Sequence, residues 1–241
     1  MEEDDDEDIV LEDIGANGEE EEYEDYVDET NIEAITSALN DRVRYFDIAG
    51  VKLSQSYGEV KEALKEHKYK LVNIEYNIPT YFSYNYDSIC RNRNILIPSN
   101  LKACIKGLAR KDKMEYVSKV DYKKHDTDES ISVYFTSPVT NHKVWKIEYK
   151  NNLNEKPGMS ENFQYQREER RRAFWYFVLN KYGEPNVGTN QWLLDVNDKN
   201  NQSLIAGYGT LTLLNQNQNA FDILEASKDA RRNFKYTNYT F

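Results

Sequence analysis

The most constraining feature of this sequence is a block of acidic residues at its N-terminal end. Residues 1–30 contain 17 of the 42 Asp and Glu residues and no Lys or Arg. Like charges at this density repel one another, and the few apolar residues between them bury too little surface to offset the entropy of folding. We therefore expect residues 1–30 to form a disordered acidic tail, with the folded region starting near residue 30.

The rest of the chain has the opposite charge. Residues 31–241 hold the other 25 acids and all 31 bases, so the body is about +6 against −17 for the tail. A partner of the body should therefore be acidic at its contact surface. The tail either only increases solubility or docks on a basic groove of the body or of a partner. Its apolar anchors for docking would be Ile9, Val10, Leu11, Tyr23, Tyr26 and Val27.

Length and composition limit the class of protein. A chain of 241 residues that is 39% hydrophobic can bury a sizeable core without a disulfide or a metal. It has no run of about 18 apolar residues, so no membrane span is predicted. Acids follow Met1 in place of a basic and then apolar leader. We expect a periplasmic or secreted protein if a signal peptide was removed, and a cytoplasmic one otherwise.

Two cysteines, Cys90 and Cys104, leave two interpretations open. They are too few and too far apart for a C-x-x-C zinc framework. In an oxidising compartment they are a disulfide candidate, because Cys104 lies one turn inside a predicted helix that can pack back on the segment ending at Cys90. In a cytosol Cys104 would be a buried thiol on the apolar face of that helix.

Helices are predicted where a capping residue precedes apolar residues at helical spacing. Gly183 and Pro185 mark the end of the longest helix. The predicted helices are a short one opening with Thr30-Asn31-Ile32-Glu33, one capped by Ser56 and ending near Lys68, one starting at Pro98-Ser99, and one capped by Ser160 and running to about Tyr182.

Strands are predicted where β-branched and aromatic residues cluster or alternate with polar ones. The clearest alternation is Ile131, Val133, Phe135 and then Trp145, Ile147, Tyr149 across a hairpin loop. The predicted strands are 69–89, broken at Pro79, then 115–124, 129–135, 143–149, 191–196 and 203–214. Residues 215–219 are expected to form a polar loop, followed by a short helix and a terminal strand within 220–241.

These elements predict an α+β fold with helices packed on one face of an antiparallel sheet. A polar linker around residues 151–158 separates two passages that each run from helix to strands. The chain therefore could consist of two tandem units, a first α+β unit at 31–155 and a second at 156–241 packed with it.

Two short passages carry a resemblance to a known family. Residues 46–60 contain Gly50-Val51 followed by Ser56 and Val60 around a helix entry, and Lys181-Tyr182-Gly183-Glu184-Pro185 forms a helix exit. Both resemble the BamE-like and β-lactamase-inhibitor-protein-like (BLIP-like) modules of the bacterial envelope. The resemblance implies an exported, non-enzymatic module whose helices pack on one face of an antiparallel sheet and whose open face or loops bind another protein.

Motifs for catalysis, cofactors and metals are weak. His67, His125 and His142 are far apart and form no zinc motif. No Gly-x-Ser-x-Gly elbow is present. Gly207-Tyr208-Gly209 lacks the third glycine of a dinucleotide loop and is interpreted as a bulge. Asp126, Asp128 and Glu129 lack the spacing of an EF-hand. We expect no catalytic residue, cofactor or metal, with a hydrolase that has a dispersed composite site as an alternative.

Arginine and aromatic residues supply the predicted partner-binding set. Arg167, Arg170 and Arg171 lie on the long helix beside Phe174-Trp175-Tyr176. This pairing also suits nucleic acid, but interleaved glutamates interrupt a phosphate footprint and favour a protein partner. The exposed strand aromatics are predicted to be Tyr81, Tyr84, Tyr86, Trp192 and Tyr208.

The predicted function is a non-catalytic protein-binding module of the bacterial envelope, or of a secretion or toxin-neutralising system, that binds through a sheet face and the basic helix. The second alternative is a nucleic-acid-binding protein with an autoinhibitory acidic tail. The sequence makes no prediction of oligomeric state.

Overall fold

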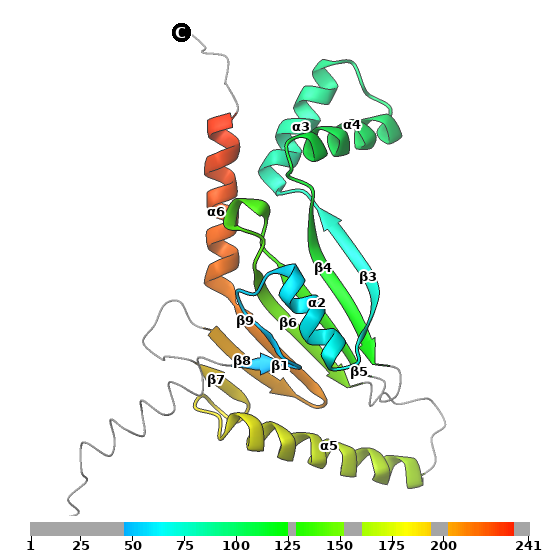
Figure 1. The fold of residues 1–241 in the computed structure, drawn as a ribbon, viewed down its shortest axis with the longest axis vertical. Coiled ribbons are helices and arrows are strands. Elements are labelled where there is room, and N and C mark those ends of the chain that lie inside the picture. The colour runs from blue at the N-terminus through cyan, green and yellow to red at the C-terminus, as the bar shows by residue number, and fades with distance from the viewer. Residues whose placement is uncertain (1–45, 125–128, 152–160, 194–201, 234–241) are drawn as a thin grey trace, which may run out of the picture.

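A seven-stranded antiparallel sheet forms the centre of the molecule (Figure 1). The computed structural model describes residues 46–124, 129–151, 161–193 and 202–233. The strand order is β3-β4-β5-β6-β9-β8-β7. The strands are β3 (Lys70–Asn77), β4 (Tyr116–Lys124), β5 (Glu129–Phe135), β6 (Val144–Asn151), β7 (Gln191–Leu193), β8 (Gln202–Gly207) and β9 (Thr210–Asn215).

A two-stranded ribbon and five helices accompany this sheet within the described residues. The ribbon pairs β1 (Asp47–Ile48) with β2 (Val51–Lys52). The helices are α2 (Tyr57–Glu66), α3 (Thr80–Asn92), α4 (Pro98–Lys111), α5 (Glu161–Tyr182) and α6 (Gln216–Asn233), with a 3₁₀ turn, η1, at Pro138–Thr140. The predicted α+β class is confirmed.

The main core lies between one face of the sheet and two helices, α2 and α5. A row of directly paired, buried residues crosses that face: Val120, Val133, Ile147, Leu213, Leu204 and Trp192. Val60 and Leu64 of α2 and Val178 of α5 pack on it. A slip of one residue in any strand would turn its apolar side chains to the other face, so this row fixes the register.

The helix that starts this layer follows its sequence signals. Ser56 and Glu59 form the predicted capping box at the start of α2, with Glu59 Oε2 accepting from the Ser56 backbone N–H at 2.7 Å. At the far end of the layer, Gly183 follows α5 with a φ of 77°, where a residue with a Cβ would be strained. The amide of Gly183 donates to Leu179 O at 2.8 Å and closes the helix.

A second, smaller cluster joins α3, α4 and α6 beyond one end of the sheet (Figure 1). Phe82 and Tyr86 of α3 pack with Ala109 of α4 and Ala230 of α6. The candidate disulfide links Cys90 and Cys104, whose Cα atoms are 6.2 Å apart, and so ties α3 to α4. We name the α3–α4 pair the helical lobe.

A buried carboxylate fixes α6 to the loop between β5 and β6. Asp222 Oδ2 accepts from the Ser137 amide at 2.9 Å, and Asp222 Oδ1 accepts from the hydroxyls of Ser137 and Thr140, each at 2.6 Å. Three donors on one carboxylate satisfy the polar groups that this junction removes from water.

The predicted strand over 69–89 is correct only in its first half. Residues 70–77 form β3, but the tyrosine-rich segment after Pro79 is helix α3, so Tyr81, Tyr84 and Tyr86 lie on a helix. The reason is that the buried residues of this segment repeat at helical spacing. Phe82, Tyr86 and Cys90 recur every four residues and are all buried, so tertiary packing of a helical face outweighs the β propensity of the tyrosines.

Three further local predictions are wrong. Tyr208-Gly209 is the two-residue turn of the β8–β9 hairpin, in place of a bulge within one strand. The predicted polar loop at 215–219 begins α6 instead, because Asn215 Oδ1 accepts from the Gln218 amide at 3.0 Å and acts as a helix cap. Trp145 was predicted to share the core face of β6 with Ile147. A register shift beside Phe135 places Val144 in the core in its stead.

The two predicted units, 31–155 and 156–241, contribute to one sheet. Strands β3–β6 come from the first range and β7–β9 from the second, and β6 pairs with β9. Several predictions lie outside the described residues: the acidic tail, the helix opening at Thr30, the cap at Ser160 and the terminal strand.

Candidate partner-binding groove

A groove of about 600 Å³ runs between α5 and the turn of the β8–β9 hairpin. Residues from three parts of the fold line it, and we name it the α5 groove. They are Glu168, Arg171, Arg172, Phe174, Trp175, Tyr176 and Leu179 of α5, Thr189 and Asn190 before β7, and Ala206, Gly207 and Tyr208 of the hairpin.

Arg171 is the central polar residue of the α5 groove. Its Nη1 donates to Glu168 Oε1 at 2.7 Å, one turn earlier on the helix. Its Nε is buried and has no hydrogen-bond acceptor among the described residues. A guanidinium has five N–H donors in a planar fork, and an unpaired buried donor costs about 1–3 kcal/mol. The Arg171 side chain is 27% exposed, so N–H groups of the guanidinium other than the buried Nε can donate to an acceptor in the groove.

Tyr208 forms the opposite wall and is 84% exposed. The guanidinium carbon of Arg171 lies 5.3 Å from the centre of the Tyr208 ring, within the range of a cation–π contact. The turn that carries Tyr208 depends on two glycines. Gly209 has a φ of 73°, and a Cβ at Gly207 would approach Thr210 Oγ1 to 2.6 Å. The turn thus holds an aromatic ring out in solvent on a rigid hairpin.

The wall that precedes β7 is fixed by hydrogen bonds. Asn190 Nδ2 donates to Ala206 O at 2.8 Å, while the Ala206 amide donates to Asn190 O at 2.9 Å. This reciprocal pair fastens the segment to β8. The segment before β7 and the β8–β9 hairpin therefore form two walls of the groove, and α5 forms the third. Because hydrogen bonds already hold the first two walls together, little backbone entropy is lost on binding.

Trp192 forms the support beneath the groove. It is 2% exposed, its Nε1 donates to Gly183 O at 3.1 Å, and its ring lies 6.3 Å from that of Trp175. It was predicted to bind a partner as an exposed strand aromatic, and that prediction is wrong because its indole fills the space between β7 and α5. Trp175, which the prediction did not include in the site, lines the groove instead.

Helix α5 is apolar on more than its inner face. Phe174, Trp175, Leu179 and Tyr182 pack toward the core, yet Tyr176 and Phe177 are 63% and 68% exposed. Exposed aromatic rings beside arginines match the composition of binding hot spots.

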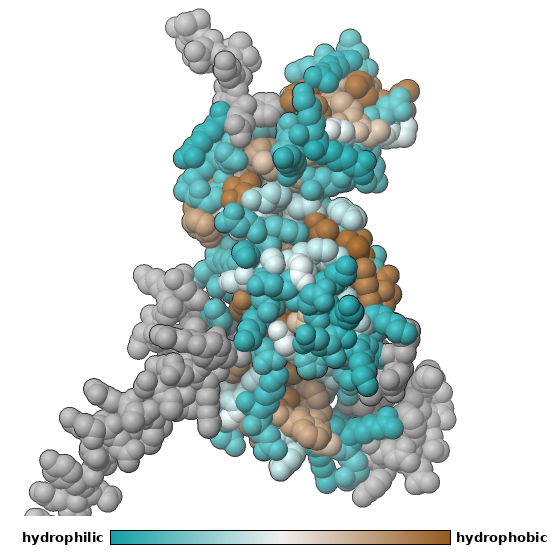
Figure 2. Space-filling view, in the orientation of Figure 1, coloured by the Kyte–Doolittle hydropathy of each residue, from teal (hydrophilic) through white to brown (hydrophobic). Residues whose placement is uncertain are grey.

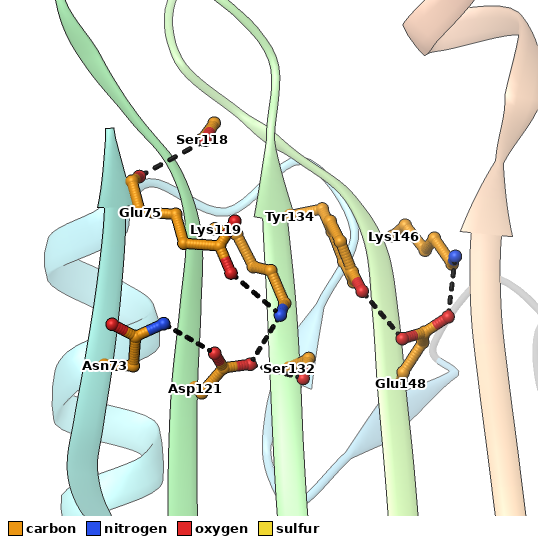
Figure 3. A network of polar contacts seen from close by, with 9 residues as sticks. All are labelled: Asn73, Glu75, Ser118, Lys119, Asp121, Ser132, Tyr134, Lys146 and Glu148. Atoms are coloured by element: carbon orange, nitrogen blue, oxygen red, sulfur yellow. Dashed lines mark hydrogen bonds and ion pairs between the residues drawn. The ribbon is translucent and has the colours of Figure 1, made fainter. Parts of the chain in front are cut away.

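The face of the sheet opposite the main core is a polar network (Figure 3). Lys119 Nζ lies 3.1 Å from both Glu75 Oε1 and Asp121 Oδ1, and Asp121 also accepts from Asn73 and Ser132. Farther along the sheet, Glu148 pairs with Lys146 at 2.6 Å and accepts from Tyr134 at 2.7 Å. These groups pair with one another, so the predicted sheet face offers few unpaired charges here.

The pKa values of two carboxyls report this pairing. Partial burial would raise the pKa of Asp121, but hydrogen bonds from Ser132, Asn73 and Lys119 outweigh it and hold the pKa below its ordinary value. The same balance holds for Glu148. Burial would raise its pKa, but hydrogen bonds from Lys146 and Tyr134 outweigh burial and lower the pKa. The network therefore stabilises the fold as long as both groups are ionised.

A second hollow of about 470 Å³ lies on the other flank of α5, toward α2. Tyr69 donates to Glu129 Oε2 at 2.6 Å inside it, and Lys124, Arg170 and Lys181 supply positive charge at its wall. Burial and the Glu129 carboxylate raise the pKa of Tyr69 far above its ordinary range. A tyrosine held neutral in this way acts as a hydrogen-bond donor.

The structure divides the predicted binding residues into three groups. Arg171 and Tyr208 meet in the α5 groove, and Arg170 lines the second hollow. Tyr81 and Tyr84 are exposed, but on the helical lobe. Tyr86 is 2% exposed and donates to Asp112, so it offers no ring to a partner and its prediction is wrong. Arg167 lies in α5, but its side chain is outside the described part.

Apolar side chains are also exposed elsewhere. Figure 2 shows hydrophobic patches over the helical lobe and along β3. Leu71 and Val72 are exposed on β3, and Leu96 and Ile97 are exposed on the helical lobe. A smaller hollow of about 360 Å³ between these two surfaces is lined by Tyr76, Lys102 and Lys106, among others. Unlike the α5 groove, its described lining holds no buried cationic donor without an acceptor.

The two described histidines and both cysteines are not among the residues that line the α5 groove. His142 Nε2 is 2.7 Å from Val117 O, and His67 stands at the end of α2. His125 is outside the described residues. Within the described ranges no three His, Cys, Asp or Glu side chains are grouped to hold a metal ion.

Comparisons of this chain with protein-family models, with curated proteins and with solved structures give no match. A helix needs about 20 apolar residues to cross a bilayer, and none of those in the described ranges meets that requirement.

Proposed function

We propose that this chain is a non-catalytic protein-binding module, and that it recognises an acidic, aromatic-containing segment of its partner in the α5 groove. The observation that carries the proposal is the meeting of Arg171 with the exposed ring of Tyr208 across an apolar hollow. Among the described residues, the lining contains Arg171 and Arg172 against one acid, Glu168.

The chemistry of the lining selects the ligand class. A carboxylate can take two parallel hydrogen bonds from a guanidinium, and such charge-assisted bonds are the strong ones. Trp175, Tyr176 and Tyr208 offer flat apolar surface for an aromatic ring of the partner. A hollow of about 600 Å³ is in the range that holds a few side chains of a peptide.

Catalysis by this groove is the less favoured alternative. Its described lining contains no His or Cys, and Glu168 is held in an ion pair with Arg171. General acid–base catalysis needs a group whose proton transfer is matched to the reaction. A hydrolase at this place would thus have to rely on residues beyond the described lining.

The setting in the bacterial envelope, or in a secretion or toxin-neutralising system, stays part of the proposal. The bond between Cys90 and Cys104 favours an oxidising compartment. Mass spectrometry of the non-reduced protein from its own cells should show a mass lower than that of the dithiol by two hydrogen atoms. Two free thiols would contradict an exported setting.

The proposal is tested by selecting displayed linear peptides on the full-length protein. We expect enriched peptides to combine Asp or Glu with Tyr, Phe or Trp. Tyr208→Ala should weaken a selected peptide about tenfold, since a central aromatic of an interface contributes more than 1 kcal/mol. This variant should fold normally because the ring is exposed.

A matched control keeps the test specific. Tyr84 is also an exposed tyrosine but lies on α3 of the helical lobe, so Tyr84→Ala should leave the affinity unchanged. The proposal fails if no acidic–aromatic peptides are enriched, or if both variants weaken binding equally.

A further inference from the structure

The described chain begins beside the helix that forms the α5 groove. The ring of Phe46 meets that of Tyr182 edge-on at 5.4 Å, and Lys181 Nζ lies 2.9 Å from Asp47 Oδ2. Phe46, the first described residue, therefore lies at the C-terminal end of α5, and 45 residues precede it in the sequence.

These preceding residues carry the chemistry that the groove should select. Residues 19–28 read Glu-Glu-Glu-Glu-Tyr-Glu-Asp-Tyr-Val-Asp, which places two tyrosines among seven acids. The tyrosines are three positions apart, and each has an acid directly on its N-terminal side. This is an acidic, aromatic-containing segment within the same chain.

The distances allow the two to meet. Arg171 and Tyr182 are 11 residues apart, so they are separated by about 16 Å along the helix axis. Twenty residues separate Tyr26 from Phe46 in the sequence, and a segment of that length reaches about 30 Å even when it is fully helical. A short linker that can span the separation gives a tethered segment an effective concentration in the millimolar range.

We propose that residues 19–28 occupy the α5 groove of their own molecule and compete with the external partner. The inference rests on the proposed function, because it assigns an intramolecular ligand to the same site. Carboxylates of the segment bind Arg171 and Arg172, and the Tyr23 and Tyr26 rings lie against Trp175 and Tyr208. A partner must displace this segment, so its apparent affinity is lowered.

A nitroxide label tests the contact in the full-length chain. Gly18→Cys introduces one thiol next to the segment, while Cys90 and Cys104 stay bonded. The indole N–H signals of the tryptophans report distance, since Trp175 lines the groove and Trp145 lies beside Tyr134 of the polar sheet face. We expect strong paramagnetic broadening of Trp175 and little of Trp145. The effect should weaken at 1 M salt, where the screening length falls to about 3 Å.

Two variants in the labelled chain make the result specific. Replacing both Tyr23 and Tyr26 by Ser should remove the broadening, whereas replacing Ile9 and Leu11 by Ser should preserve it. The Tyr23→Ser and Tyr26→Ser chain should also bind a selected peptide about tenfold more tightly, as expected when a millimolar internal competitor is lost from a site with a Kd of roughly 0.1 mM.

Failure of this inference is distinguishable from failure of the proposed function. Equal broadening of Trp145 and Trp175, or no effect of the tyrosine substitutions, overturns the intramolecular contact. The same holds if broadening arises only between molecules, in a mixture of labelled chains with separate ¹⁵N-labelled chains. The groove itself is refuted only by the loss of its distinction between Tyr208→Ala and Tyr84→Ala.

Discussion

Arg171 and Arg172 are neighbours in sequence but differ in their surroundings. Arg172 is largely exposed and lies 3.9 Å from Glu169, a geometry that contributes little to stability. Arg171 is half-buried, lies over Tyr208 and has an Nε without an acceptor among the described residues. The difference comes from the β8–β9 hairpin, which covers one arginine and not the other.

Individual side chains also determine the acid sensitivity of the sheet. The folded-state pKa values of Asp121 and Glu148 are lowered, so the stability that these carboxylates contribute is present above their unfolded pKa values of about 4. It is lost as the pH falls through the lower folded-state values. Unfolding free energies from urea titrations between pH 6 and pH 2 should therefore decrease more steeply in the wild type than in a chain carrying Asp121→Asn and Glu148→Gln.

A control for this comparison is Glu66→Gln, at the exposed end of α2. It should keep the wild-type slope. Identical slopes in the wild type and the double variant would show that the polar network does not contribute to the pH dependence.

At the scale of elements, the sequence was informative wherever capping and periodicity agreed. Ser56, Glu59 and the buried pair Val60 and Leu64 point to the same helix, and α2 forms there. The segment after Pro79 gave conflicting signals, because its tyrosines favour a strand while its buried positions repeat every four residues. Only the contacts with α4 and α6 decide between them, and those contacts are distant in sequence.

The helical lobe gives a prediction at this scale. Its disulfide joins residues separated by 14 positions, and closing a loop of that size stabilises a fold by about 3 kcal/mol on the chain-entropy estimate. Reduction of the wild-type protein should lower its free energy of unfolding by about that amount, measured by urea titration with and without reductant. A chain with Cys90→Ala and Cys104→Ala should not respond to reductant. A change below about 1 kcal/mol in the wild type would contradict the prediction.

At the scale of the whole molecule, the site depends on a pairing that periodicity does not specify. Strand β9 returns to pair with β6, and this brings Tyr208 beside Arg171 of α5, which lies 37 residues earlier in the chain (208 − 171). The sequence predicted Arg171 and Tyr208 separately as candidate binding residues. It placed neither next to the other, and it assigned Trp192 to the surface when that residue supports the groove from below.

Charge is the other property of the whole molecule. The acidic segment and the basic body belong to one chain, and the described fold starts at the helix that carries the candidate site. Under the proposal, self-binding and partner binding compete for the same groove. Salt should consequently affect partner affinity in two opposing ways. It weakens the partner's own charged contacts, and it also weakens the contacts of the competing segment, which frees the groove.

The central claim is that the α5 groove binds acidic, aromatic-containing peptides, and a titration of the ¹⁵N-labelled full-length protein with one selected peptide tests it most directly. We expect the signals of the Trp175 indole and of the Tyr208 and Gly209 amides to shift and to give the same Kd. The signal of the Trp145 indole, on the opposite face of the sheet, should not change. Shifts centred on Trp145, on the helical lobe or on β3, with the groove signals unchanged, would contradict it.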